Sequence, residues 1–184
     1  MNKLYSLALG LLSVATSWAQ STVSTTTNTA NNSGGGGVMF EVSATAPVFI
    51  TGASAVFSSV ATGPAEVWYK QGSIATNYPG SGNVSAAGGW TLALTGNATS
   101  TSSTTMSPIA FGSTMIPLNG STTYTFVING AGALGGARYM TGSGSANIFT
   151  DGTLTIDNTN GRGGTIPSSM VNTPRWFVGS LTYI

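Results

Sequence analysis

Chemistry in this chain has to come from carboxylates, because the sequence contains neither His nor Cys. Their absence removes the imidazole base, the thiolate nucleophile and the common zinc and copper ligands. Beyond the N-terminal segment four acidic residues are available: Glu41, Glu66, Asp151 and Asp157. A glycosidase needs two carboxylates that flank one bond, and a calcium site needs several oxygen ligands. No motif in the sequence assembles either, so we expect no enzyme activity, no catalytic residue, no metal site and no cofactor.

The acidic residues have simpler structural explanations in their local context. Glu66 and Lys70 are four residues apart in a strand-like run, which places both side chains on one polar face of a sheet. Glu41 lies near the start of the folded region and Arg175 near its end, so the two pair if the terminal strands are neighbours. Asp151 is followed by Gly, a dipeptide typical of turns.

A second chemistry open to this chain is the stacking of sugars on aromatic rings. Tyr78 lies in a loop rich in Gly, Ser and Asn at 73–88, where a binding role competes with packing of the loop. Trp68 and the Tyr after it are adjacent in a strand, so they point to opposite faces. Arg175 and Trp176 are neighbours that can form a cation–π pair or bind a ligand. The candidate ligand-binding residues are therefore Trp68, Tyr78, Arg175 and Trp176, with burial in the core as the alternative.

The composition excludes nucleic acid as a partner and favours a folded domain. The 184 residues include 52 Ser or Thr, 26 Gly and only nine charged residues, with a formal net charge of +1. Such a chain has no basic patch to neutralise phosphates. A hydrophobic content of 41% with 9% aromatic residues is sufficient for a packed core.

The first 19 residues read as a signal peptide. A short basic start at 1–3 precedes an apolar run at 4–14, and small residues precede the expected cleavage site after Ala19. The apolar run is too short to span a bilayer, and no later run is longer, so we expect no membrane span. Cleavage removes Lys3 and leaves four basic and four acidic residues. The sequence therefore predicts a secreted protein, extracellular or at the cell surface.

Residues 20–37 form a tail rich in Ser, Thr and Gly with one large apolar residue, Val23. Because so little apolar surface is available to offset the chain entropy, the composition favours a flexible linker. The alternative is an extended strand that pairs with a neighbouring subunit, since Thr-rich stretches suit β structure.

From residue 38 onward the sequence predicts one all-β domain over 38–184. Short β-rich runs alternate with Gly, Pro, Asn and Ser, and no helical period persists for three turns. The clearest alternation sets Tyr124, Phe126 and Ile128 against two Thr residues. This pattern predicts an antiparallel β-sandwich, jelly-roll-like. The expected strands are 38–44, 48–57, 65–71, 90–95, 106–111, 122–128, 137–141, 153–157 and 175–183.

Several short segments in this domain, taken in order, carry a resemblance. They are VMFEV at 38–42, ITG at 50–52, AEVWYKQG at 65–72, GWTL at 89–92, IPL at 116–118 before TYTF at 123–126, LTI at 154–156 and PRWFVGSLTY at 174–183. Together they resemble an extracellular β-sandwich module of secreted and surface proteins of Bacteroidetes and other environmental bacteria. The resemblance covers 38–184. It implies a non-catalytic accessory module and carries no catalytic motif with it.

The expected surface is nearly uncharged, and this bears on partners. Soluble proteins use charge and edge lysines to prevent association, whereas this chain holds only Lys70 after the signal. We therefore expect a structural or adhesive role at the cell surface or in extracellular matrix, with self-association. The expected partners are further copies or other surface and matrix components, and no nucleic acid. The alternative is a carbohydrate-binding module that uses exposed aromatic residues to hold glycans.

Overall fold

The computed structural model describes residues 19–33, 35–80, 82–167 and 169–184. The expected signal peptide lies outside these residues, apart from Ala19. The described chain is all-β and its strands pair antiparallel, as the sequence predicts. Among the described residues, no helix is long and apolar enough to cross a bilayer.

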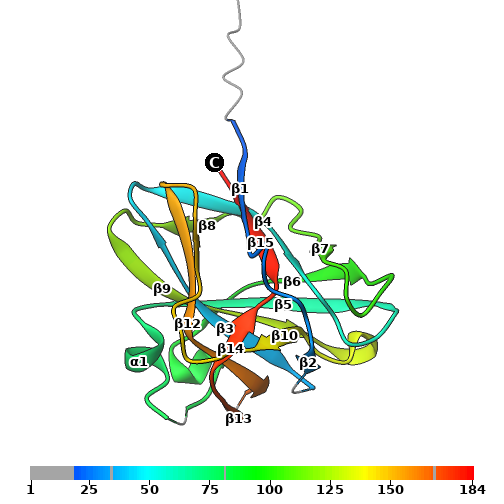
Figure 1. Cartoon of the computed structure of the whole chain (residues 1–184). Helices are drawn as coiled ribbons and strands as arrows, with labels where there is room; N and C mark the ends of the chain where they lie inside the picture. Colours follow the sequence, from blue (N-terminus) through cyan, green and yellow to red (C-terminus); the bar gives the residue numbers. More distant parts are fainter. Residues whose placement is uncertain (1–18, 34, 81, 168) are drawn as a thin grey trace, which may run out of the picture.

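Twelve strands of the described chain form one sheet that rolls up into a nearly closed barrel (Figure 1). Along the sheet the strands follow the order β1, β15, β4, β7, β6, β5, β9, β3, β12, β11, with β8 beside β4 and β13 beside β12. Their bounds are β1 Ser21–Ser24, β3 Gly37–Ala44, β4 Val48–Ala55, β5 Thr62–Gln71, β6 Thr91–Thr99, β7 Ser107–Ile109, β8 Ile116–Leu118, β9 Thr122–Gly130, β11 Ile148–Thr150, β12 Leu154–Thr165, β13 Ser169–Asn172 and β15 Gly179–Tyr183.

A second, small sheet closes one side of the barrel. It consists of β14 Arg175–Phe177, β10 Arg138–Thr141 and β2 Asn32–Ser33, in that order. In the described part of the chain, three short helices lie in the connections: α1 Ile74–Asn77, η1 Ala86–Gly88 and η2 Gly132–Leu134. None of these helices contributes a layer of its own, and the core is built mainly from strand faces.

The main core fills the inside of the rolled sheet. On β3, Val38, Phe40 and Val42 point inward and are fully buried, which is the alternation that a strand imposes. Phe40 stacks on Phe177 with ring centroids 4.1 Å apart, and Phe126 lies 6.1 Å from Phe40. These three rings connect β3 and β9 of the large sheet to β14 of the small one.

A smaller core lies on the outer face of β3, β9 and β5. Met39 and Val127 point outward there, and the loop that carries α1 covers them. Ile74, Tyr78, Val84, Trp90 and Met170 complete this cluster. The loop is therefore packed on the sheet rather than extended into solvent.

The expected strands are present, with differences at several positions. Strands β8, β11 and β13 were not predicted, and β12 continues to Thr165 instead of ending near Asp157. The expected strand 175–183 is two strands that belong to different sheets, β14 and β15. Segments of the chain that lack alternating apolar residues can thus still form strands, because neighbouring strands pair with them.

The largest difference concerns the tail, for which the composition favours a linker. Residues 20–33, here called the N-terminal arm, lie along both sheets: β1 pairs with β15, and β2 pairs with β10. Val23 is 4% exposed and joins the main core. Thr25 is fully buried and shares two hydrogen bonds with Gly179. The arm pairs with strands of its own chain, which differs both from a free linker and from the alternative of a strand donated to a neighbouring subunit.

Three asparagine side chains join the arm to the body of the domain; we call them the amide network. Asn28 and Asn147 exchange two hydrogen bonds of 3.0 Å between their amides. Asn158 donates to the Asn147 carbonyl oxygen at 2.9 Å. Asn28 also donates to the Phe177 carbonyl at 2.8 Å, and the Phe177 N–H donates to Asn158 at 3.2 Å. The network thus holds the arm, β12 and β14 together without an ion pair.

Candidate functional site

Tyr78, the aromatic residue that the sequence places in a polar loop, is fully buried. Its hydroxyl accepts a hydrogen bond from the Met170 N–H at 3.1 Å. The Arg162 guanidinium lies over its ring, 5.5 Å from the centroid. The loop folds back onto the sheet because Ile74 and Val84 are buried beside Tyr78. Tyr78 therefore anchors the loop, and it offers no face to a ligand.

Trp68 is half-buried and lies on the outer face of β5, opposite to Tyr69, as the alternation predicts. Its indole N–H donates to the Glu66 carboxylate at 3.1 Å, and Asn129 donates to the same oxygen at 3.0 Å. Lys70 does not pair with Glu66 and donates instead to the Gly88 carbonyl at 2.9 Å. Trp68 and Glu66 thus line a shallow depression beside the covering loop.

Trp176 and Arg175 do not form the expected pair with each other. Trp176 is only 8% exposed. Arg175 lies over the Tyr139 ring, 5.7 Å from its centroid, and donates to the Pro174 carbonyl at 2.8 Å. The four predicted ligand-binding residues are therefore dispersed, and two of them, Tyr78 and Trp176, belong to the interior.

The acidic residues do not converge on one groove. Glu41 accepts a hydrogen bond of 2.7 Å from the Ile74 N–H rather than pairing with Arg175. Asp157 is the cross-strand neighbour of Glu41, on β12. Burial raises the pKa of Glu41, its bond from Ile74 lowers it, and the nearby Asp157 charge raises it further, so that the pKa lies above its usual value. The two carboxylates therefore repel each other across the strand pair.

The repulsion between Glu41 and Asp157 predicts that the stability of the fold depends on pH. A carboxyl group whose pKa is higher in the folded state stabilises the fold most when protonated, and that contribution is lost as the pH rises through the folded pKa. We expect E41Q to raise the free energy of unfolding at pH 7 by less than about 1 kcal/mol, because Glu41 is partly exposed and solvent screens its charge. Urea unfolding at pH 7 and pH 3.5 tests this, since the gain should vanish at pH 3.5. A loss of stability at pH 7 would contradict it.

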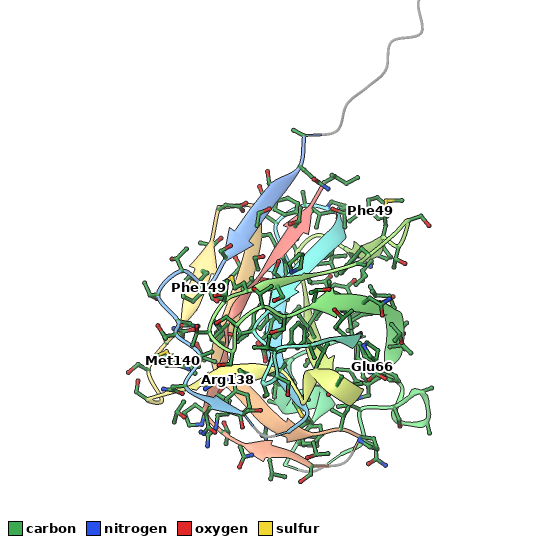
Figure 2. All side chains as sticks on the ribbon, turned by 90° about the vertical axis from the view of Figure 1, so that its right-hand side faces the viewer. Phe49, Glu66, Arg138, Met140 and Phe149 are labelled. Carbon is green, nitrogen blue, oxygen red and sulfur yellow. The ribbon has the colours of Figure 1, made fainter. Side chains whose placement is uncertain are left out.

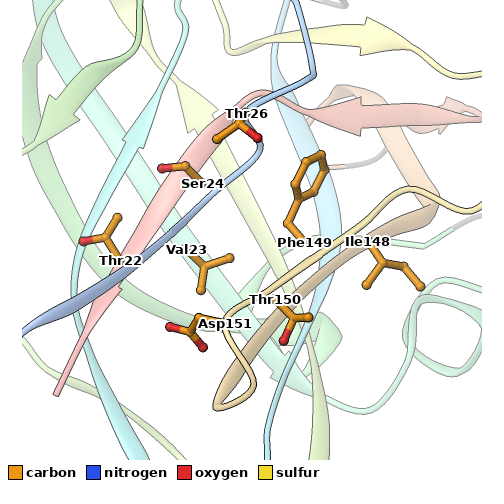
Figure 3. A pocket seen from close by; sticks show the side chains of 8 residues that line it. All are labelled: Thr22, Val23, Ser24, Thr26, Ile148, Phe149, Thr150 and Asp151. Carbon is orange, nitrogen blue, oxygen red and sulfur yellow. The ribbon is translucent and has the colours of Figure 1, made fainter.

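The most distinctive surface feature is a groove of about 420 Å³ between β1 and β11, here called the edge groove (Figure 3). Of the strands that the structure describes, β1 pairs only with β15, and β11 only with β12. Among the described residues, the facing sides of both strands pair with no other strand. The edge groove is lined by Thr22, Val23, Ser24 and Thr26 on one side and by Ile148, Phe149, Thr150 and Asp151 on the other.

Asp151 forms one end of the edge groove and confirms the turn that the sequence predicts there. Its carboxylate accepts hydrogen bonds from the Thr153 and Leu154 N–H groups at 3.0 and 2.9 Å, and from the Tyr183 hydroxyl at 2.8 Å. Burial raises the pKa of Asp151, but these hydrogen bonds outweigh it and hold the pKa below its usual value. Burial, followed by the bond to Asp151, raises the pKa of Tyr183. The charge of Asp151 is thus already engaged inside the protein.

A second hollow, here called the Tyr69 cleft, opens where the large sheet splits. It has a volume of about 450 Å³. Strand β6 meets β7 only at the Ala98–Ile109 pair, so the Thr91 end of β6 has no neighbour on that side among the described strands. Strand β8 borders the opposite side of the opening. Residues that line the Tyr69 cleft are Tyr69, Lys70, Gln71, Gly89, Thr91, Pro117, Asn119 and Tyr124.

Comparisons with known proteins find neither a protein-family model nor a curated protein that matches this chain.

Proposed function

We propose that this chain is a secreted, non-catalytic β protein with a structural or adhesive role at the cell surface or in extracellular matrix, and that it self-associates through the edges of its large sheet. The observation that carries this proposal is the edge groove. Two strands there, β1 and β11, present backbone N–H and C=O groups that pair with no strand of the described chain. Such edges are templates for pairing with another chain.

The side chains at these edges lack the usual protection against association. Proteins block exposed strand edges with lysine, proline or inward-facing charge. In the edge groove the only charged residue is Asp151, whose carboxylate is bound by its own turn and by Tyr183. Ile148 is 52% exposed, and the remaining residues are mainly Ser and Thr. We expect a second copy of the chain to occupy the edge groove. The strand edges of both copies carry the same neutral, β-forming side chains, so they suit pairing with each other.

The lack of charge elsewhere supports the same proposal. After removal of the expected signal peptide the chain has no formal net charge, so no long-range repulsion keeps copies apart. Pairing of β1 of one copy with β11 of the next joins different strands of identical chains, and such a contact continues as a filament unless the rotation closes a ring. This arrangement suits an extracellular scaffold.

A lysine placed in the edge groove tests this proposal. We expect residues 20–184 to form larger particles as the concentration rises, and I148K to weaken this association at least tenfold, because a buried ammonium next to a paired edge is costly. Light scattering across a concentration series, with negative-stain microscopy, measures the effect. The side chain of Ile148 is half-exposed, so the monomer should fold normally.

The matched control is V60K, which adds the same charge at a residue that is 69% exposed and outside the edge groove. V60K should associate like the wild type. The proposal fails if the wild-type protein stays monomeric at high concentration, or if both lysine variants weaken association equally.

We assign the chain to the jelly-roll-like sandwiches and to the extracellular module that it resembles. Secretion follows from the signal peptide expected at 1–19. The nearly neutral composition, rich in Ser and Thr, supports an extracellular setting.

A further inference from the structure

We propose that the Tyr69 cleft binds a neutral saccharide, a role that differs from self-association and that uses a different part of the surface. None of the residues lining the cleft belongs to the edge groove. Its volume of about 450 Å³ lies within the range of small-molecule sites. It opens where the sheet splits between β6 and β8, and its walls are β5, β6, β8 and β9 together with Gly89 and Asn119 from the connections.

The floor of the Tyr69 cleft is aromatic. Tyr69 is half-buried, and its ring lies 6.4 Å from that of Tyr124 and 5.9 Å from that of Phe126. Both neighbours belong to the main core, which holds Tyr69 from behind. An aromatic ring fixed in this way presents a rigid surface to the C–H groups of a sugar, at little cost in conformational entropy.

The polar groups around this floor suit hydroxyl groups of a ligand. Within the described chain, no group hydrogen-bonds to the Tyr69 hydroxyl or to the side-chain amides of Gln71 and Asn119. The Tyr124 hydroxyl accepts from the Asn119 N–H at 3.1 Å and keeps its own hydrogen to donate. Amides and hydroxyls provide both donors and acceptors, as a sugar requires.

The cleft offers no carboxylate to a basic ligand and at most one cation to an acidic ligand. Lys70 is the only charged residue in its lining, and its ammonium already donates to the Gly88 carbonyl at 2.9 Å. No carboxylate is present to bind a cation or an amino sugar. An uncharged, hydroxyl-rich ligand therefore fits the Tyr69 cleft better than a phosphate or an ammonium compound does.

A glycan array followed by calorimetry tests this inference on residues 20–184. The array carries neutral oligosaccharides, including cello-, laminari-, manno- and xylohexaose, together with uronate and sulfated glycans. We expect binding to at least one neutral hexaose with a micromolar to millimolar dissociation constant. Y69A should weaken that binding at least tenfold, whereas Y69F, which keeps the ring, should stay within about threefold of the wild type.

Two controls separate this inference from self-association and from misfolding. I148K, which lies outside the Tyr69 cleft, should bind the same hexaose as the wild type even when it no longer associates. Circular dichroism and thermal unfolding should show that Y69A remains folded, and Q71A provides a second cleft variant if Y69A does not. Binding to acidic glycans alone, binding to none, or binding that Y69A and Q71A leave unchanged would overturn the inference.

Discussion

Replacing Phe40 with Ala should lower the free energy of unfolding by about 3–5 kcal/mol, the usual cost of removing a large aromatic side chain from a core. Phe40 is fully buried and stacks on Phe177 at 4.1 Å. The cavity would open at the point where the large sheet meets β14, so the neighbouring strands cannot collapse to fill it without distorting both sheets. Equilibrium unfolding in urea, followed by tryptophan fluorescence, measures the loss.

The matched control for this prediction is F49A. Phe49 lies on β4 between the core residues Val48 and Ile50, but its side chain is 45% exposed and is on the opposite face of the strand (Figure 2). Its removal should cost less than about 1 kcal/mol, because little of the side chain is withdrawn from water. Equal losses for F40A and F49A would contradict the assignment of the main core.

The second large effect should come from the amide network. We expect N158A to lower the free energy of unfolding by about 2–4 kcal/mol, because it leaves the buried Phe177 N–H without its acceptor and removes one of the two donors to the Asn147 carbonyl oxygen. Asn158 is fully buried, so water cannot replace these bonds without opening the structure. Urea unfolding measures the total, and proteolysis within the N-terminal arm measures its release.

Two further variants test whether the network acts as a unit. N160A removes an exposed amide from the same strand and should be nearly neutral. N28A removes the arm's own contribution, and its loss should be strongly non-additive with that of N158A, since both act through Asn147 and Phe177. Additive losses would mean that the asparagines act independently.

Much of the fold could be predicted from the sequence wherever one strand face is apolar. Tyr124 and Phe126 alternate with Thr123 and Thr125, and β9 lies where this pattern predicts it. β8 escaped prediction because Pro117 at its centre interrupts the pattern, which an edge position tolerates. The continuation of β12 is hidden by Gly161 and Gly163, whose missing side chains leave room for the Arg175 backbone and the Tyr139 ring.

The candidate site was less predictable, because sheet closure brings together segments that no local pattern connects. β1 and β11 face each other only after the sheet has rolled up, and neither contains a motif. Tyr69 was visible in the sequence as the neighbour of Trp68, but its place at a split in the sheet depends on where β7 and β8 leave β4. Burial of Tyr78 depends on Met170, which lies 92 residues further along the chain.

The position of the two chain ends has a mechanical consequence. Ser21 pairs with Tyr183, so the start of the first strand, β1, and the end of the last strand, β15, lie at the same end of the domain (Figure 1). Tension applied between the two ends would break the hydrogen-bonded residue pairs between β1 and β15 one after another. Strands loaded in this way separate at low force. A tensile network of these molecules would therefore resist stretching only if neighbouring copies transmit the load across their sheet edges and not through their termini.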